Sequence, residues 1–167
     1  IGATPLLYAI EGNSVEVVDF LAHFNSAIDK VDANGNDYVT YLAEGFGRMV
    51  TGDLKEKVQY FHKNGMRFDT KQANGNTIFH LLAQKGDVKF MDFFKDYAKG
   101  DINKKNELGL TPLHIIAMNA KSVEDIRAWM NYGFDKTILS DLEESVYQLA
   151  SENELLIEQL DALEFLK

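Results

Sequence analysis

The sequence predicts an all-α solenoid of about four helix-turn-helix repeats, followed by a degenerate C-terminal unit. Three observations lead to this fold class. A short motif led by glycine recurs at Gly2, Gly35, Gly75 and Gly109, at intervals of 33, 40 and 34 residues. Two short stretches with helical spacing of apolar residues follow each motif. The only two prolines, Pro5 and Pro112, occupy the same place in their copies. A fixed period of this length predicts units that stack on their neighbours.

Each motif begins with a polar turn and leads into a first helix. The glycine supplies a positive φ at little cost, as in the turns at 32–35 and 72–75. The Thr or Asp that follows is suited to cap the helix. Proline then falls at the first helical position, where its missing N–H has no partner to lose. We therefore expect short hairpin-like turns that project from one edge of the solenoid.

A second helix completes each repeat. Its apolar residues are Val18 and Leu21 in the first copy, and in the later copies Leu54, Val58, Phe61, Phe90, Met91, Phe94, Val123, Ile126 and Met130. Glycine is expected to end three of these helices, at Gly65, Gly100 and Gly133, and Ser26 holds that place in the first. Helices this short cannot bury an apolar face alone, so the repeats must stack to form one core.

The motifs resemble the ankyrin repeat. Residues 109–117 read Gly-Leu-Thr-Pro-Leu-His-Ile-Ile-Ala, and residues 2–6 and 75–83 are similar. The second copy departs from the motif because Asp37-Tyr38 replaces Thr-Pro, and the fifth copy, placed at Leu142, has lost the glycine. The chain is expected to form a single ankyrin-repeat domain over 1–167, with repeats at about 1–31, 32–71, 72–105 and 106–138 and a cap at 139–167.

Composition excludes several function classes. The chain has 17 Lys and Arg against 26 Asp and Glu, and a net charge of −9 disfavours a nucleic-acid partner. No apolar run is long enough for membrane insertion, and the absence of cysteine excludes disulfides, thiolate metal sites and a cysteine nucleophile. Cysteine content leaves the compartment open. No cofactor or metal is expected.

Two histidines, His80 and His114, fall five residues after a turn glycine. No other histidine shares this position, which argues against a metal or catalytic site. In ankyrin repeats a histidine at this place ties a loop to the adjacent turn through hydrogen bonds, and the resemblance implies that structural role here.

Two glycine-containing segments invite ligand-binding interpretations that their spacing does not support. Residues 32–37 alternate oxygen-bearing side chains, but a calcium loop would place Lys30 at its first ligand position. An Asx-rich turn fits better. Residues 45–52 contain three glycines without the Lys-Ser pair of a phosphate loop. They fall in the seven-residue insertion of the second repeat, between Ala43 and Val58. We expect a tolerated insertion with local packing; the alternative is a projecting feature at Phe46, Arg48 and Met49.

The C-terminal end is acidic. Residues 137–167 hold eight of the 26 acidic residues and a single lysine. Leu156, Leu160 and Leu163 predict a final helix that packs inward along this stripe while its carboxylates face water. A charged cap of the solenoid is the favoured interpretation, and a site for a basic partner is the alternative.

The resemblance implies a protein-binding surface made of turn tips and the concave face of the first helices. The tip positions are Ala33, Asn34, Asn36, Ala73, Asn74, Asn76, Glu107, Leu108 and Leu110. The concave positions are Glu44, Gln84, Lys85, Met118 and Asn119. Leu108 and Leu110 are the most suggestive, because two exposed leucines on one tip would anchor a partner; packing on the neighbouring turn is the alternative.

The expected function is therefore a non-catalytic protein-protein interaction module with an unidentified protein partner. A regulatory or spacer segment of a larger protein or enzyme is the alternative. An enzyme-like site grafted on the solenoid has no supporting constellation of residues. We also expect the natural chain to continue upstream with further ankyrin repeats, which would cover an apolar outer face of the first repeat.

Overall fold

The computed structural model describes residues 2–12, 14–24, 28–46, 51–86, 88–96 and 102–167. These residues form α-helices and short 3₁₀ helices and contain no strand. The helices are α1 (Pro5–Gly12), α2 (Val15–Phe24), α3 (Tyr38–Glu44), α4 (Thr51–Lys63), α5 (Ile78–Lys85), η1 (Val88–Phe90), α6 (Met91–Phe94), α7 (Pro112–Asn119), α8 (Val123–Met130), α9 (Val146–Glu152) and η2 (Glu154–Leu166). The predicted all-α class is confirmed.

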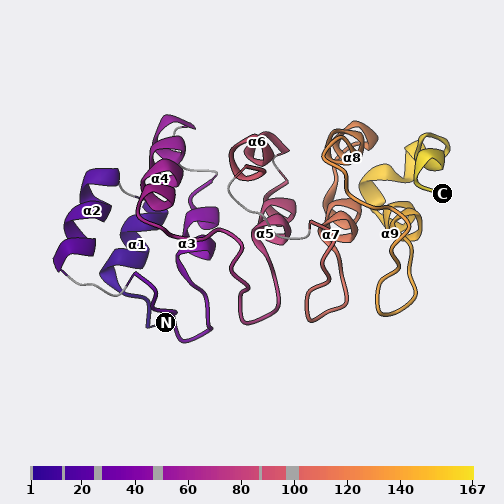
Figure 1. Ribbon diagram of the computed structural model, residues 1–167. Coiled ribbons are helices and arrows are strands. Elements are labelled where there is room, and N and C mark those ends of the chain that lie inside the picture. The colour runs from indigo at the N-terminus through magenta and orange to yellow at the C-terminus, as the bar shows by residue number, and fades with distance from the viewer. Residues whose placement is uncertain (1, 13, 25–27, 47–50, 87, 97–101) are drawn as a thin grey trace.

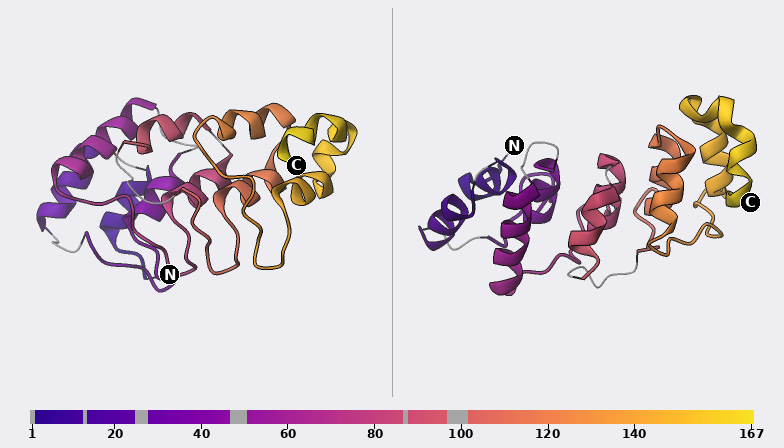
Figure 2. Two further views of the ribbon diagram at one scale, coloured as in Figure 1. Left: turned by 45° about the vertical axis from the view of Figure 1, so that its right-hand side comes forward. Right: turned by 90° about the horizontal axis from the view of Figure 1, so that it is seen from above.

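The helices form two rows. An inner row consists of α1, α3, α5, α7 and α9, each in contact with the next, and an outer row of α2, α4, α6 and α8 lies above it (Figure 1). The segments that lead into the inner helices hang from one edge as long turns. Seen from above, the helix pairs stand side by side along one axis, with the termini at opposite ends (Figure 2). No helix of the described residues is long and apolar enough to cross a bilayer.

The core runs through all helix pairs. The residue four positions after each turn glycine is buried in every copy, at Leu6, Val39, Phe79 and Leu113, with exposed fractions of 0–2%. Alanine at the eighth position in three copies lets neighbouring inner helices approach closely: Ala43, Ala83 and Ala117. The outer helices add most of the apolar residues that their spacing predicted, although Leu21 and Met130 are only half-buried. The repeated pattern therefore builds one continuous core.

Two predicted helix ends are confirmed. Gly65 and Gly133 follow α4 and α8 with φ of 75° and 87°, the left-handed conformation that ends a helix. Gly100 and Ser26, expected to play the same part, lie outside the described residues.

Phe46, at the start of the expected insertion of the second repeat, packs against the next repeat. Phe46 is only 3% exposed, and its ring lies 4.5 Å from that of Phe90 and 5.6 Å from that of Phe94. The alternative of a projecting Phe46 is therefore wrong, because the ring fills a place between two helix pairs. Arg48 and Met49 lie outside the described residues. Part of the extra length extends α4, which has 13 residues against 10 in α2.

The C-terminal segment differs from the single helix that its leucine stripe predicted. It is a 3₁₀ helix interrupted at Gln159, where φ is −121° and ψ is 20°. Leu156 and Leu163 are buried as expected, but Leu160 is 37% exposed and Leu166 is buried at 2% instead. The tighter helix and the kink shift the apolar face away from the i, i+4, i+7 spacing of an α-helix.

Candidate functional site

Four of the long turns that lead into the inner helices share one hydrogen-bond pattern. In each turn the N–H of the first residue donates to the carbonyl four positions on, and the fourth residue donates back to the first carbonyl. The turns begin at Asp32, Gln72, Asn106 and Ser140, and the first of these bonds is 2.9 Å long in each. This repeated closure makes every tip the same rigid hairpin-like shape. The predicted turns are confirmed.

The polar side chains at the start of these turns hold the backbone. Asp32 Oδ1 accepts the N–H groups of Asn34 and Asn36 at 2.8 and 2.9 Å. In the third turn, Asn106 Oδ1 accepts those of Leu108 and Leu110, both at 3.0 Å. Asp32 thus holds its own turn, as the Asx-turn interpretation expected, while Asp37 Oδ1 accepts the Val39 N–H at the start of α3 and the Gln72 side-chain N–H of the next turn. Burial acts to raise the pKa of Asp32, but the bonds from Asn36, Asn34 and Tyr41 together lower it.

The turn glycines meet two demands. Gly35, Gly75 and Gly109 have φ of 72–78°, and each is crossed closely by the next turn. A Cβ on Gly109 would lie 2.3 Å from the Cβ of Asp141, and one on Gly35 would lie 2.5 Å from the Cβ of Ala73. Neighbouring turns are also hydrogen-bonded: the N–H of Asp141 donates to the carbonyl of Gly109 at 3.2 Å. Glycine is therefore needed both for its backbone conformation and for the approach of the next turn.

The fifth unit replaces this glycine with Glu143. Glu143 has φ of 62°, and its N–H donates to the Ser140 carbonyl as that of Gly109 donates to Asn106. The fifth copy thus begins 34 residues after Gly109, at Glu143, and the placement at Leu142 was wrong by one residue. Because no described turn lies beyond Glu143, its side chain meets no neighbour of the kind that excludes a Cβ at Gly109.

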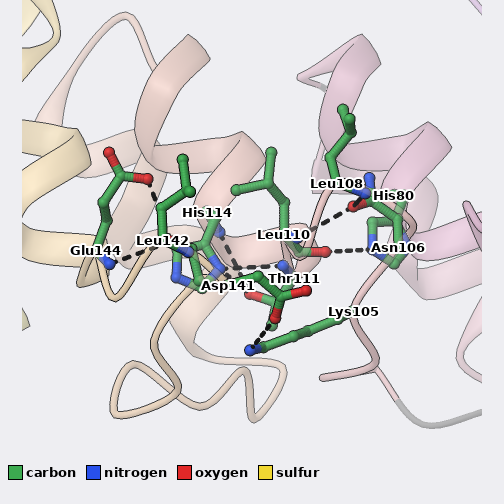
Figure 3. Close-up of polar contacts among 11 residues, drawn as sticks. His80, Lys105, Asn106, Leu108, Leu110, Thr111, His114, Asp141, Leu142 and Glu144 are labelled. Atoms are coloured by element: carbon green, nitrogen blue, oxygen red, sulfur yellow. Dashed lines mark hydrogen bonds and ion pairs between the residues drawn. The ribbon is translucent and has the colours of Figure 1, made fainter.

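His80 links two units of the stack. Its Nδ1 accepts the Thr77 N–H at 3.1 Å, which places the ring proton on Nε2. Nε2 then donates to the carbonyl of Leu110 at 3.0 Å, in the next turn (Figure 3). Burial lowers the pKa of His80, which keeps the ring neutral. The expected structural role of this histidine is confirmed by its contacts.

His114 makes only part of this arrangement. Its Nδ1 accepts the Thr111 N–H at 3.0 Å, but Nε2 is buried without a hydrogen-bond partner among the described residues. Glu144 of the next turn takes the place that Leu110 has for His80, and its carbonyl acts to raise the pKa of His114. Burial is the larger effect and lowers this pKa. His114 therefore fixes its own helix start more firmly than it fixes the next turn.

The predicted tip residues divide by exposure. Most are exposed, namely Ala33, Asn34, Ala73, Asn74, Glu107 and Leu108. Asn36 is half-buried. Asn76 is only 2% exposed, and its Oδ1 accepts the side-chain N–H of Asn106 at 2.9 Å, so its side chain bridges two turns and is not offered to a partner. Leu110 is half-buried against the core, so the expectation of two exposed leucines on this tip holds only for Leu108.

The structure reveals a second exposed leucine on the next tip. Leu142 is 79% exposed and Leu108 is 74% exposed, and each immediately precedes the positive-φ residue of its turn. Sequence reasoning missed this pair because the fifth copy was aligned one residue early. Aligning it at a period of 34, as between Gly75 and Gly109, places Leu142 opposite Leu108.

The predicted concave residues are all exposed, and several share one groove. Glu44 and Lys85 form an ion pair of 2.7 Å between α3 and α5. Gln84 and Lys85 line a groove of about 360 Å³ together with Asn119 and, deeper in, Trp129. Met118, at 48% exposed, lies beside them in sequence. The structure thus brings Gln84, Lys85 and Asn119 together along the groove, and Glu44 is linked to them by its ion pair with Lys85.

The titratable side chains of the described surface do not meet the needs of a metal site. Among the described residues, no three His, Asp or Glu side chains come close enough to hold a metal ion. The two buried histidines accept hydrogen bonds from the N–H groups of Thr77 and Thr111, and neither lines the groove beside Trp129.

The fold and these turns define an ankyrin-type solenoid, and comparison with known proteins places the chain in that family. Residues 46–140 match the family model described as ankyrin repeats in three copies, and residues 1–33 match the model of a single ankyrin repeat. The chain belongs to the ankyrin-repeat family.

Two relatives are similar over much of the chain. A putative ankyrin repeat protein of Rickettsia felis is 29% identical over 159 residues, which are 94% of this chain and 37% of the relative. Alpha-latroinsectotoxin-Lt1a of Latrodectus tredecimguttatus is 25% identical over 117 residues, which are 70% of this chain and 8% of the relative. The chain thus spans only a minor part of both relatives.

Proposed function

We propose that this ankyrin-repeat domain is a non-catalytic protein-binding module that holds its partner against the turn tips and the exposed face of the inner helices. Ankyrin repeats generally bind proteins, and the surface of this one supports the same use. The observation that carries the proposal is the matched exposure of Leu108 and Leu142 on neighbouring tips. Leucines exposed to this extent gain most when a partner covers them, roughly 1.5–3 kcal/mol each before the costs of association.

The rigidity of the tips supports this role. The N–H of Leu108 is held by Asn106 Oδ1 at 3.0 Å, and that of Leu142 by Ser140 Oγ at 3.2 Å. Lys105 of one turn also pairs with Asp141 of the next at 2.7 Å (Figure 3). Since the backbone at both leucines is already fixed, a partner would bind them with little loss of conformational entropy.

The groove between α5 and α7 extends the proposed surface. It offers the Lys85 ammonium and the Gln84 and Asn119 amides beside apolar Ile116 and Trp129. Such a mixture of polar rim and apolar floor suits a side chain or a short peptide segment. In this proposal the leucine tips provide the apolar anchors and the groove provides polar specificity.

A comparison of captured proteins tests the proposal. The immobilised domain is exposed to an extract of the source cells, and retained proteins are compared for the wild type and for Leu108→Ser combined with Leu142→Ser. Leu155→Ser combined with Ile157→Ser is the matched control, because both of these residues are 61% exposed but lie on η2. We expect a partner that the wild type and the control retain and the tip variant loses. Equal retention by all three folded proteins would remove the tips from the site.

A further inference from the structure

A side chain from the following unit closes the C-terminal end of α7. Asn153, which precedes η2, donates from Nδ2 to the carbonyl oxygens of Ala117 and Ala120, at 3.1 and 2.8 Å. The carbonyls at the end of a helix have no partner within the helix, so a side chain that reaches them satisfies them. A primary amide from one unit thus fits against the helix end of the unit before it.

The corresponding position of an earlier unit closes the end of α3. Lys85 lies ten residues after Gly75, as Asn153 lies ten residues after Glu143. The Lys85 ammonium pairs with Glu44, the last residue of α3, at 2.7 Å. At both junctions a side chain with N–H donors therefore reaches back to the end of the preceding inner helix.

The end of α5 lacks this contact. Asn119 holds the corresponding place, ten residues after its turn glycine, but its Nδ2 donates to the carbonyl of Ile115 at 2.9 Å, within its own helix. Ala83 and Gly86, which correspond to the two residues that Asn153 binds in the next unit, line the groove of about 360 Å³ between α5 and α7. Among the described residues, no side chain donates to their carbonyl oxygens. The groove thus stands where Asn153 closes the next junction.

The groove offers hydrogen-bond acceptors and donors together. The carbonyl oxygens at the end of α5 are acceptors, and Gln84 and Lys121, which also line the groove, carry N–H donors. The polar ends of these two side chains bind no other residue in the described part of the chain. Ile116 and Trp129 add apolar lining. A ligand of this groove must therefore both donate and accept hydrogen bonds beside an apolar wall.

The charges of the groove favour a neutral ligand. Lys85 is already paired with Glu44, and Asp125 Oδ2 accepts the backbone N–H groups of Lys121 and Ser122 at 3.1 and 3.0 Å. The remaining Lys121 ammonium and Asp125 carboxylate have opposite charges, so the groove has no net charge that would select an ion. A carboxylate cannot donate to the carbonyls of α5, and an ammonium cannot accept from Lys121. A primary amide does both, because its NH₂ group donates twice and its oxygen accepts.

We propose that the groove between α5 and α7 holds an asparagine or glutamine side chain of the protein partner. Its NH₂ group donates to the carbonyls of Ala83 and Gly86, and its oxygen accepts from Lys121. The amide thereby takes the place at the end of α5 that Asn153 takes at the end of α7. This inference rests on the proposed function and names the group that the groove recognises.

Matched peptides test this recognition on the whole chain. The probe is an acetylated copy of residues 151–156 with Glu152→Ser and Glu154→Ser, closed as an N-methylamide so that its asparagine is the only primary amide. Control peptides carry aspartate or lysine in place of that asparagine. Binding is followed by the NMR signals of the Trp129 indole N–H and the Gly86 backbone N–H. We expect saturable shifts with a Kd on the order of 1 mM, and about tenfold weaker binding of both control peptides.

A variant with a closed groove shows whether the peptide binds there. Gln84→Glu with Asn119→Lys copies the Glu44–Lys85 pair onto the next junction, because these residues hold the same places after their turn glycines. We expect a folded protein, checked by circular dichroism, in which the asparagine peptide no longer shifts the groove signals.

A second variant leaves the groove open. Lys121→Met should weaken binding of the asparagine peptide about threefold to tenfold, since it removes the donor to the amide oxygen. Lys63→Met, at an exposed site on α4, is the matched control and should bind as the wild type does.

Three results would overturn the proposal. They are the absence of groove shifts with the asparagine peptide, equal or tighter binding of the aspartate or lysine peptide, and undiminished binding to both the closed variant and Lys121→Met. The leucine tips are tested separately, because Leu108→Ser with Leu142→Ser leaves the groove residues unchanged. Retention of the partner by that tip variant would count against the proposed function, whereas the peptide titration alone decides the role of the groove.

Discussion

His80 Nε2 lies 3.0 Å from the carbonyl oxygen of Leu110, which belongs to the next turn of the stack. With Nδ1 on the Thr77 N–H, the ring joins a helix start to the following unit and leaves no ring nitrogen free. His114 repeats the first contact but not the second. The two histidines therefore differ in how much they stabilise the stack, although the sequence gives them equivalent positions.

This difference predicts unequal costs of truncation. His80→Ala removes a buried side chain and its hydrogen bonds to two partly buried backbone groups, and should lower the free energy of unfolding by about 2–3 kcal/mol. His114→Ala gives up one hydrogen bond fewer and should cost about 1 kcal/mol less. Urea unfolding followed by circular dichroism measures both. Equal costs would mean that the bond to Leu110 adds no stability.

The buried histidines also predict a pH dependence of stability. Burial lowers the pKa of both rings from the ordinary value of 6.5, so the unfolded chain binds more protons than the folded chain below about that pH. Their contribution is therefore fully present above pH 6.5 and is lost as the pH falls through the folded-state pKa values. We expect the loss of stability between pH 7.5 and 5.5 to be smaller in His80→Gln than in the wild type. His23→Gln, at an exposed site, is the control and should behave as the wild type does; a wild-type slope in His80→Gln would contradict the assignment.

Two glycines with similar φ allow the cost of backbone strain to be measured apart from the cost of a steric clash. Gly109→Ala should destabilise the fold strongly for two reasons. Alanine would have to adopt the φ of 72°, and its Cβ would lie 2.3 Å from Asp141. Gly65→Ala has a similar φ of 75° but meets nothing within 4 Å, so it should cost only about 1 kcal/mol. The difference between the two losses of stability, measured by thermal unfolding, gives the cost of the clash with the neighbouring turn. Equal costs would leave no energetic role for that approach.

Glu143 predicts a stabilising substitution. Its φ of 62° is unfavourable for a residue with a Cβ, so Glu143→Gly should raise the free energy of unfolding by about 0.5–1 kcal/mol. Glu107→Gly, on an exposed tip without a positive φ, should not stabilise and is the matched control. Denaturant unfolding of both variants checks the sign, and a loss of stability in Glu143→Gly would show that the Glu143 side chain is worth more than the strain it imposes.

The sequence predicted the regular part of the fold well, because glycine turns, caps and helical spacing are local signals repeated in each copy. It failed where tertiary contact decides. Phe46 in the insertion is buried by the rings of Phe90 and Phe94, and Asn76 is buried by Asn106 of the next turn. A residue-type pattern does not record which neighbour covers a side chain.

The candidate surface shows the same limit. Leu142 escaped notice because Glu143 takes the left-handed conformation that was expected only of glycine. Because this copy has no turn glycine, its start was predicted from a period of 33 residues after Gly109, which falls one residue early. The hydrogen bonds between Ser140, Glu143 and Glu144 fix the true register and reveal Leu142 as the counterpart of Leu108.

Site-specific photocrosslinking tests the proposed binding surface most directly. p-Benzoylphenylalanine replaces Leu108, Leu142 or, as the control, Leu155 in the folded domain, and crosslinked proteins from an extract of the source cells are identified by mass spectrometry. We predict that positions 108 and 142 crosslink to the same protein, and that position 155 does not. No common protein at positions 108 and 142, or equal crosslinking of it at position 155, would contradict the assignment of the tips as the binding surface.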